Sequence, residues 1–291
     1  MRTYIAGPMR GYDRFNFGAF DAARDMLREL GHDPVSPADM DRAIGIDEHS
    51  TELPPGFIHT ALRRDFAAIC TCQAIAFLPG WESSSGARAE RRVGEAIGLA
   101  MYRVDPAAGE FYRESIIGLS GYARSGKDTL AQYLIERGYE HRAFAAPLKG
   151  MLAALDPTLG GSRGRLRTHV EAVGWEGAKQ LDEVRGLLQR LGTEAGRKYL
   201  GDNVWVDALF RAPSTGRIVI SDVRFVNEAD AIRQRGGLVV RVQRPGVAPV
   251  NAHPSETDLD DYDFDVVVPN DGTVEDLKVW ADSIVEIAAH H

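Results

Sequence analysis

The chain has 291 residues, of which 34 are basic and 42 acidic, so its formal net charge at pH 7 is −8. A hydrophobic fraction of 44% and a charged fraction of 26% are ordinary for globular proteins, and they exclude a disordered, collagenous or coiled-coil chain. The length predicts two domains, and the acidic balance argues against bulk binding to a nucleic-acid backbone.

The sequence predicts neither a membrane span nor a secretory leader. No apolar run approaches the roughly 18 residues of a membrane span, and the first residues, MRTYIAG, lack the long apolar core of a secretory signal. Cys70 and Cys72 are too few and too close together for a disulfide framework. We therefore expect a cytoplasmic protein in a reducing compartment.

Strand and helix patterns alternate over residues 1–105. Apolar residues recur at helical spacing after a short strand signal, and Gly31 is placed to end the first helix. The predicted strands are 3–6, 74–78 and 101–104, and the predicted helices are 17–30, 58–69 and 85–100. Such alternation predicts an α/β domain in which a parallel sheet is flanked by helices.

Residues 106–114 break this pattern and are predicted to be a linker to a second α/β domain at 115–291. In that domain the predicted strands are 115–120, 217–223, 238–243 and 265–268, and the predicted helices are 127–137, 180–200 and 274–289. The Gly/Arg-rich segment 160–168 is either a lid over phosphates or a solvated loop.

A phosphate-binding loop is the strongest motif in the chain. The segment GYARSGKDT matches GxxxxGK directly after an apolar strand and directly before an amphipathic helix. Glycines let the backbone aim N–H groups inward, the helix N-terminus adds partial positive charge, and Lys127 can bridge the outer phosphates. The predicted ATP-binding residues are Gly121, Arg124, Ser125, Gly126, Lys127, Asp128 and Thr129.

The metal-binding hydroxyl of this motif is displaced by one position. Asp128 follows Lys127 where Ser or Thr is usual, and Thr129 comes next. Either Thr129 takes over the contact with Mg²⁺, or Asp128 holds the ion directly or through water.

A second candidate element is the apolar strand that ends at Asp222. A carboxylate at the C-terminal end of such a strand suits Mg²⁺, because ligands of open α/β sheets bind at that edge. Arg224 lies two residues on and can reach a phosphate. The alternative is that Asp222 is only a turn residue or a helix cap.

Four segments together resemble the deoxynucleoside monophosphate kinases of bacteriophages, over residues 115–291. They are GYARSGKDT, ISDVRFVNEADAI, LLQRLGTEAGRKYLGDNVWVDAL and HPSE. The resemblance implies transfer of the ATP γ-phosphate to a deoxynucleoside monophosphate (dNMP), in the host cytoplasm if a phage encodes the chain. It also implies an acceptor site near Gln189, Arg197, Asp202 and Trp205, with His253 and Glu256 in a polar loop. The alternatives are an ordinary amphipathic helix with a core Trp, and a sensor that binds nucleotides without chemistry.

A second constellation of candidate residues lies in the first domain. A strand ends in a Gly loop that carries Arg10, which suits a 5′-phosphate, and Ser84 lies at a predicted helix N-terminus, a second anion-friendly place. Glu90 follows on the first turns of that helix, where a carboxylate can attack a sugar C1′ with help from Asp65. The alternative is that Glu90 belongs to a solvated helix face.

The segments YIAGPMRG, RRDFAAI and LPGWESSSGARAERRVGEAIG resemble the nucleoside 2-deoxyribosyltransferase-like superfamily, over residues 1–104. That superfamily includes 2′-deoxynucleoside 5′-phosphate N-glycosidases. The resemblance implies that Glu90 is the nucleophile, that Asp65 assists, that Tyr4, Arg10 and Ser84 contact the substrate, and that the protein is a homodimer. Two departures from the pattern are Gln73, where relatives commonly have Asp, and the arginines Arg88, Arg91 and Arg92. The alternative is a nucleotide-binding or dimerisation module that has lost its chemistry.

Overall fold

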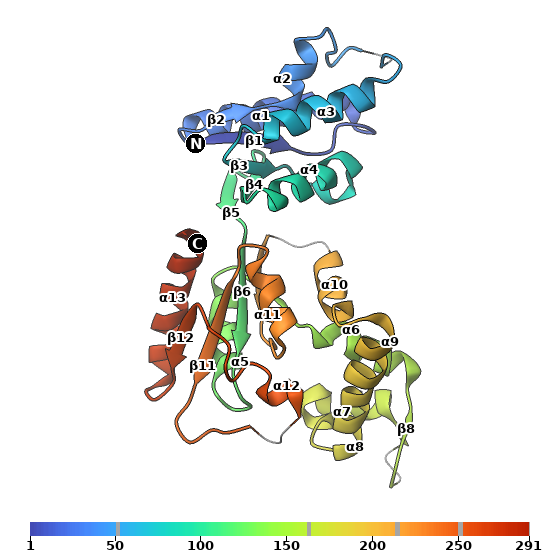
Figure 1. Ribbon diagram of the computed structural model, residues 1–291, viewed down its shortest axis with the longest axis vertical. Coiled ribbons are helices and arrows are strands. Elements are labelled where there is room, and N and C mark those ends of the chain that lie inside the picture. Colours follow the sequence, from blue (N-terminus) through green and yellow to red (C-terminus); the bar gives the residue numbers. More distant parts are fainter. Residues whose placement is uncertain (51–52, 162–163, 213–215, 250–252, 291) are drawn as a thin grey trace. The chain divides into compact units, whose positions relative to one another are not determined.

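The computed structural model describes residues 1–50, 53–161, 164–212, 216–249 and 253–290. The chain divides into two compact units, Met1–Glu114 and Ser115–His291 (Figure 1). Each unit is a mainly parallel β-sheet flanked by helices, which confirms the predicted α/β fold class. No helix in the described parts of the chain is long and apolar enough to cross a membrane.

The first unit is built on a five-stranded sheet in the order β2-β1-β3-β4-β5. The strands are β1 (Arg2–Ala6), β2 (Asp33–Val35), β3 (Ala74–Phe77), β4 (Ala100–Asp105) and β5 (Glu110–Arg113). The helices are α1 (Phe17–Glu29), α2 (Pro37–Arg42), α3 (Phe57–Ile69) and α4 (Ser85–Ala96), with 3-10 turns at Asp13–Asn16 and Trp81–Ser83. Successive residues of β1 enter opposite cores: Ile5 packs with Phe20 and Leu27 of α1, while Tyr4 packs with Ile69 and Trp81. Burial of both faces is what a central parallel strand requires.

The predicted linker at 106–114 is wrong, because most of this segment belongs to the first sheet. Strand β5 pairs antiparallel with β4, and the Phe111 ring stacks on Tyr102 with centroids 4.9 Å apart. Glu114 accepts hydrogen bonds from Arg91 at 2.7 Å and from Arg103 at 2.6 Å. The hairpin therefore belongs to the first unit, and the boundary between the two units falls between residues 114 and 115.

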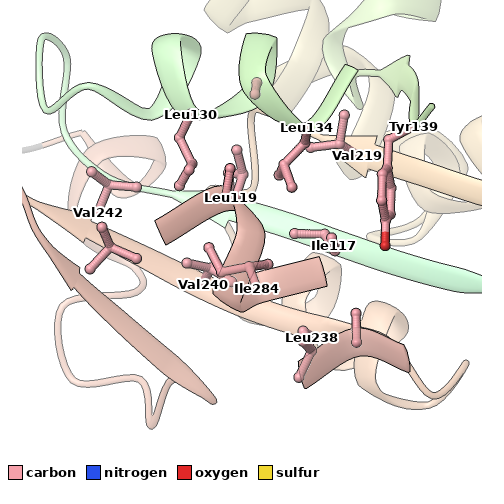
Figure 2. Packing of buried hydrophobic residues seen from close by; sticks show 14 of the residues in the cluster. Ile117, Leu119, Leu130, Leu134, Tyr139, Val219, Leu238, Val240, Val242 and Ile284 are labelled. Atoms are coloured by element: carbon pink, nitrogen blue, oxygen red, sulfur yellow. The ribbon is translucent and has the colours of Figure 1, made fainter. Parts of the chain in front are cut away.

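The second unit has a parallel sheet in the order β12-β11-β6-β10-β7. The strands are β6 (Ser115–Ser120), β7 (Glu140–Arg142), β10 (Arg217–Ile220), β11 (Leu238–Gln243) and β12 (Val266–Pro269). Helices α5 (Lys127–Glu136) and α13 (Val274–His290) cover one face, where Leu130, Leu134 and Ile284 pack on Ile117 and Val240 (Figure 2). Helix α11 (Val226–Arg233) packs on the other face through Ile232.

A group of helices is inserted between β7 and β10, and α12 (Pro254–Thr257) lies between β11 and β12. The inserted elements are α6 (Ala145–Leu155), the hairpin β8 (Thr158–Leu159) and β9 (Gly164–Arg165), α7 (Leu166–Ala178), α8 (Asp182–Gln189), a π-helix (Arg190–Arg197), α9 (Lys198–Leu200) and α10 (Val204–Arg211). Of the Gly/Arg-rich segment, residues 162–163 lie outside the described residues. Arg165 pairs with Asp156, and Arg167 donates to the Ala153 carbonyl, so both arginines are held by the end of α6.

Candidate functional sites

The predicted phosphate-binding loop lies between the buried strand β6 and helix α5. Gly121 and Gly126 have φ angles of 151° and 102°, where a side chain is strained. A Cβ on Gly121 would lie 2.7 Å from the Val242 carbonyl oxygen, and one on Gly126 would collide with the side chain of Asn270. Asn270 Nδ2 donates to the Ser125 carbonyl at 2.7 Å, which ties the loop to the end of β12.

The loop has the polar groups that a bound phosphate chain requires. Lys127 is buried at the start of α5, and its Nζ lies 3.7 Å from the Asp128 carboxylate. Ser125 Oγ is buried and has no hydrogen-bond partner among the described residues, as expected of a hydroxyl whose partner is a ligand. Arg124 has a left-handed φ of 66°, a backbone conformation that occurs in anion-binding nests.

Two of the three residues predicted for Mg²⁺ are exposed to solvent, and the carboxylate of the third caps a helix. Asp128 and Thr129 are exposed on the first turn of α5, beside Lys127. The Asp222 carboxylate accepts hydrogen bonds from the Phe144 and Ala145 N–H groups at 2.8 and 2.9 Å, so it caps the first turn of α6. Mg²⁺ beside a nucleotide needs only one or two carboxylates, because phosphate oxygens and waters supply the rest. The assignment of the metal ligands stays a prediction.

Arg197 was predicted to lie near the acceptor nucleotide. In the structure its guanidinium is buried and contacts other groups of the protein. It donates to Glu228 at 2.6 Å and to Asn227 at 3.0 Å, and it lies 3.9 Å from the centre of the Phe225 ring. Burial, and next the charge of Asp222, raise the pKa of Glu228 to about 7. These contacts join the π-helix to α11, and a role toward substrate stays a prediction.

Two of the other predicted acceptor residues lie beside Arg197. Arg197 donates to the Asp202 carbonyl at 2.9 Å, and the Arg224 N–H donates at 2.9 Å to Glu228, the partner of Arg197. Trp205 is buried, donates from Nε1 to the Gly192 carbonyl at 2.9 Å and leaves no room for a Cβ on Gly196, so it is a core residue. Arg224 donates to Glu256 at 2.6 Å, which connects the strand end to the predicted polar loop. The remaining positions are Gln189, half-buried at the end of α8, Asp202, exposed before α10, and His253, whose ring contacts Ser255.

A pocket that the sequence analysis did not predict adjoins the loop. It has a volume of about 680 Å³, and its lining includes Tyr122, Ser125, Arg241, Asp260, Tyr262 and Phe264. Arg241 is buried, donates to Asp260 at 3.2 Å and lies 4.6 Å from the centre of the Tyr122 ring. The residues that line the pocket come from three segments far apart in the sequence, so no local motif predicts the pocket.

The first unit brings together three of its predicted site residues. Tyr4, Asp65 and Glu90 are all buried, and the Tyr4 hydroxyl donates to Glu90 Oε1 at 3.0 Å. Burial, and next the charge of Asp65, raise the pKa of Glu90 to about 8. Arg64, which the sequence analysis missed, donates to Asp65 at 3.0 Å and to the buried Asp41 at 2.6 Å. The solvated-face alternative for Glu90 is therefore wrong.

The remaining candidate residues of the first unit have separate roles. Ser84 caps α4, because its Oγ accepts a hydrogen bond from the Ala87 N–H at 3.2 Å. Arg10 is exposed in the loop after β1. Gln73, the departure from the family pattern, accepts a hydrogen bond from the Arg2 N–H at the N-terminal end of β1. That end of β1 is opposite the loop that carries Arg10, so the Gln73 side chain stabilises the sheet.

The second unit has a strand, a glycine-rich loop and a helix in succession, with the loop at the C-terminal ends of the strands of a parallel sheet. This arrangement defines it as a P-loop nucleotide-binding domain. Residues 165–280 match the family model "Deoxynucleotide monophosphate kinase". A protein of Acanthamoeba polyphaga mimivirus, described as "Putative deoxynucleotide monophosphate kinase", is 35% identical over 195 residues, which are 60% of this chain and 97% of that protein. The chain therefore belongs to the deoxynucleotide monophosphate kinase family.

The other similarities are more limited in extent. The deoxynucleotide monophosphate kinase of Enterobacteria phage T4 is 34% identical over 32% of this chain, and that of Escherichia phage RB69 is 29% identical over 32%. These matches span only 42% and 41% of the two phage proteins. Dephospho-CoA kinase from Campylobacter jejuni is 10% identical, with a TM-score of 0.34 over 61% of this chain and 98% of its own. Residues 1–103 match a domain of unknown function, DUF4406.

Proposed function

We propose that the second unit transfers the γ-phosphate of ATP to a deoxynucleoside 5′-monophosphate. The observation that carries this proposal is the phosphate loop, in which Lys127 is buried and the Ser125 hydroxyl has no partner in the described parts of the chain. The chain belongs to the deoxynucleotide monophosphate kinase family. The family suggests a dNMP as the acceptor substrate, and the loop provides a binding site for the donor phosphates.

The protein contributes positioning and charge. In this proposal the N–H groups of the loop and Lys127 hold the donor phosphates, which fixes the transferring group and neutralises the charge that spreads over its oxygens. Asp128 or Thr129, and Asp222, would hold Mg²⁺, which would supply further neutralisation of the phosphates. The pocket beside Tyr122 is wide enough for the donor base, and its aromatic lining suits stacking.

The experiment is a coupled assay of ADP formation with ATP, Mg²⁺ and each of the four common dNMPs. The wild-type chain is expected to form ADP only when a dNMP is present. Lys127→Met is expected to lower kcat by about a hundredfold or more, since one preorganised contact to a transferring group is worth about 3–4 kcal/mol. Lys278→Met, on α13, is the matched control. Absence of dNMP-dependent turnover would support the sensor alternative.

A second activity is favoured by the buried Tyr4, Asp65 and Glu90 of the first unit. We propose that this unit hydrolyses the N-glycosidic bond of a dNMP. Glu90 attacks C1′ as the bond to the base breaks, Asp65 assists the leaving base, and water then hydrolyses the Glu90–C1′ ester to give deoxyribose 5-phosphate. Because an attacking carboxylate must be ionised, base release is expected to rise with pH up to about 8.

The test is chromatographic detection of free base and deoxyribose 5-phosphate from each dNMP. Glu90→Ala is expected to abolish their release while leaving ADP formation within twofold, because the two units are separate. Equal release by both proteins would exclude Glu90 as nucleophile. No release by the wild type would support the alternative of a binding or dimerisation module.

The expected homodimer is measured by light scattering, and a monomer at micromolar concentration would contradict it.

A further inference from the structure

Two of the chain's five lysines hold one exposed carboxylate between them. Lys179 Nζ lies 2.6 Å from Glu176 Oε1, and Lys149 Nζ lies 3.9 Å from the same oxygen. The two lysine side chains are only 31% and 23% exposed, whereas the Glu176 side chain is 83% exposed. Two partly exposed ammonium groups therefore share a single carboxylate that projects into solvent.

Helix α6 fixes Lys149 at the edge of the sheet where the phosphate loop lies. Asp222, just beyond the C-terminal end of β10, accepts hydrogen bonds from Phe144 and Ala145 at the start of α6. Lys149 lies one turn further along the helix, on the same side as Ala145. Strand β10 pairs directly with β6, which leads into the phosphate loop.

Electrostatic effects connect the cluster with the loop itself. Partial shielding from water would raise the pKa of Glu176, but the hydrogen bond and charge of Lys179 lower it below its usual value. The charges of Lys149 and of Lys127 in the loop lower it further. Burial, and next the charge of Lys179, lower the pKa of Lys149, against the opposing charges of Glu176 and Asp222. Glu176 is thus within electrostatic reach of Lys127 in the loop, and Lys149 is within reach of Asp222.

The arginines predicted for the acceptor have better anchored partners than these lysines. Arg197 is in a buried pair with Glu228, and Arg224 donates to Glu256, whose side chain is only 15% exposed. Displacing either carboxylate would leave a shielded negative charge without its partner, which is costly. Glu176, in contrast, can rotate into water at little cost, because exposed ion pairs contribute only about 0–1 kcal/mol.

We propose that Lys149 and Lys179 bind the 5′-phosphate of the acceptor nucleotide, and that Glu176 occupies their ammonium groups only until this phosphate displaces it. The proposal rests on the kinase function above. The acceptor phosphate must lie in line with the transferring group and carries more negative charge than one carboxylate. Glu176 compensates one of the two positive charges, and the phosphate, with its larger negative charge, compensates both once this carboxylate has rotated away.

The test compares KM values in the full-length chain. Lys149→Met and Lys179→Met keep the aliphatic length of the side chain and remove its charge. Each is expected to raise KM for the dNMP about 10- to 100-fold, with KM for ATP within twofold, as for loss of a charge-assisted phosphate contact. Glu176→Gln is expected to lower KM for the dNMP severalfold, because the competing carboxylate is gone. A merely structural cluster would not give these opposite changes. Lys278→Met is the control, and circular dichroism checks the fold of each variant.

Calorimetric titration of the four common dNMPs, without ATP, separates this proposal from the kinase assignment. Binding that depends on both lysines in a chain without turnover would support the phosphate site and refute the kinase. Turnover with KM for the dNMP within twofold of wild type in both lysine variants would refute the phosphate site and keep the kinase. A rise in KM for ATP instead would assign the lysines to the donor and overturn the proposal.

Discussion

Replacement of Glu90 by Gln is expected to stabilise the first unit, and to do so more strongly as the pH rises. Glu90 is buried and accepts a hydrogen bond from Tyr4, while its pKa is raised to about 8 by burial and by the charge of Asp65. Gln has nearly the same volume and keeps an oxygen that accepts the Tyr4 hydrogen bond, but it does not ionise.

The magnitude follows from proton linkage. In the unfolded chain Glu90 ionises near pH 4.5, and in the folded unit near pH 8. Between these values the folded protein binds the extra proton, so the free energy of unfolding of the wild type falls as pH rises. Each pKa unit corresponds to about 1.4 kcal/mol, so the loss approaches about 4–5 kcal/mol above pH 8 and vanishes below pH 4.5. The Gln variant does not carry this loss.

The assay is urea unfolding of the full chain at pH 5 and pH 8.5, followed by hydrogen-exchange mass spectrometry of peptides from α4. The difference in unfolding free energy between Glu90→Gln and wild type is expected to grow by several kcal/mol between the two pH values. Glu29→Gln, at an exposed position on α1, is the control and should show no such growth. A difference that stays constant with pH would refute the reasoning.

Two further predictions concern the second unit. Gly126→Ala is expected to lower kcat by at least a hundredfold, because its φ of 102° and its contact with Asn270 leave no place for a methyl group. Steady-state kinetics measure this, and activity near the wild-type value would contradict the loop geometry. Arg197→Met is expected to lower the free energy of unfolding by about 3–5 kcal/mol, because it leaves Glu228 buried without its cation. Urea unfolding measures it, and a loss below about 1 kcal/mol would show that the pair is not structural.

A local motif made the phosphate loop of the second unit predictable. The phosphate loop needs only glycines at fixed offsets between an apolar strand and a helix, and all of that information lies within one short segment. The roles of Arg197 and Asp222 were less accessible, because their partners Glu228 and Phe144 lie 31 and 78 residues away. An Arg that suits a phosphate and an Arg that holds a buried Glu look alike in sequence.

In the first unit, prediction from the sequence failed in the same way at the short edge strand β5. β5 spans four residues, with neither a long apolar run nor a clean alternation, so its composition resembles a linker. What makes it a strand is the stacking of Phe111 on Tyr102 and the pairing of Glu114 with two arginines. These contacts exist only in the folded sheet. The convergence of Tyr4, Asp65 and Glu90 was expected from a family resemblance, whereas Arg64 and its pairing with Asp41 were not.

The central claim, phosphoryl transfer from ATP to a dNMP, is tested most directly by following the γ-phosphate itself. The full-length chain is incubated with Mg²⁺, ATP labelled with ³²P in the γ-phosphate, and each dNMP in turn, and the products are separated by chromatography. The account predicts label in the deoxynucleoside diphosphate for at least one dNMP in the wild type, and its loss in Lys127→Met. Label that remains in ATP, or appears only as inorganic phosphate, with every common and modified dNMP would contradict the account.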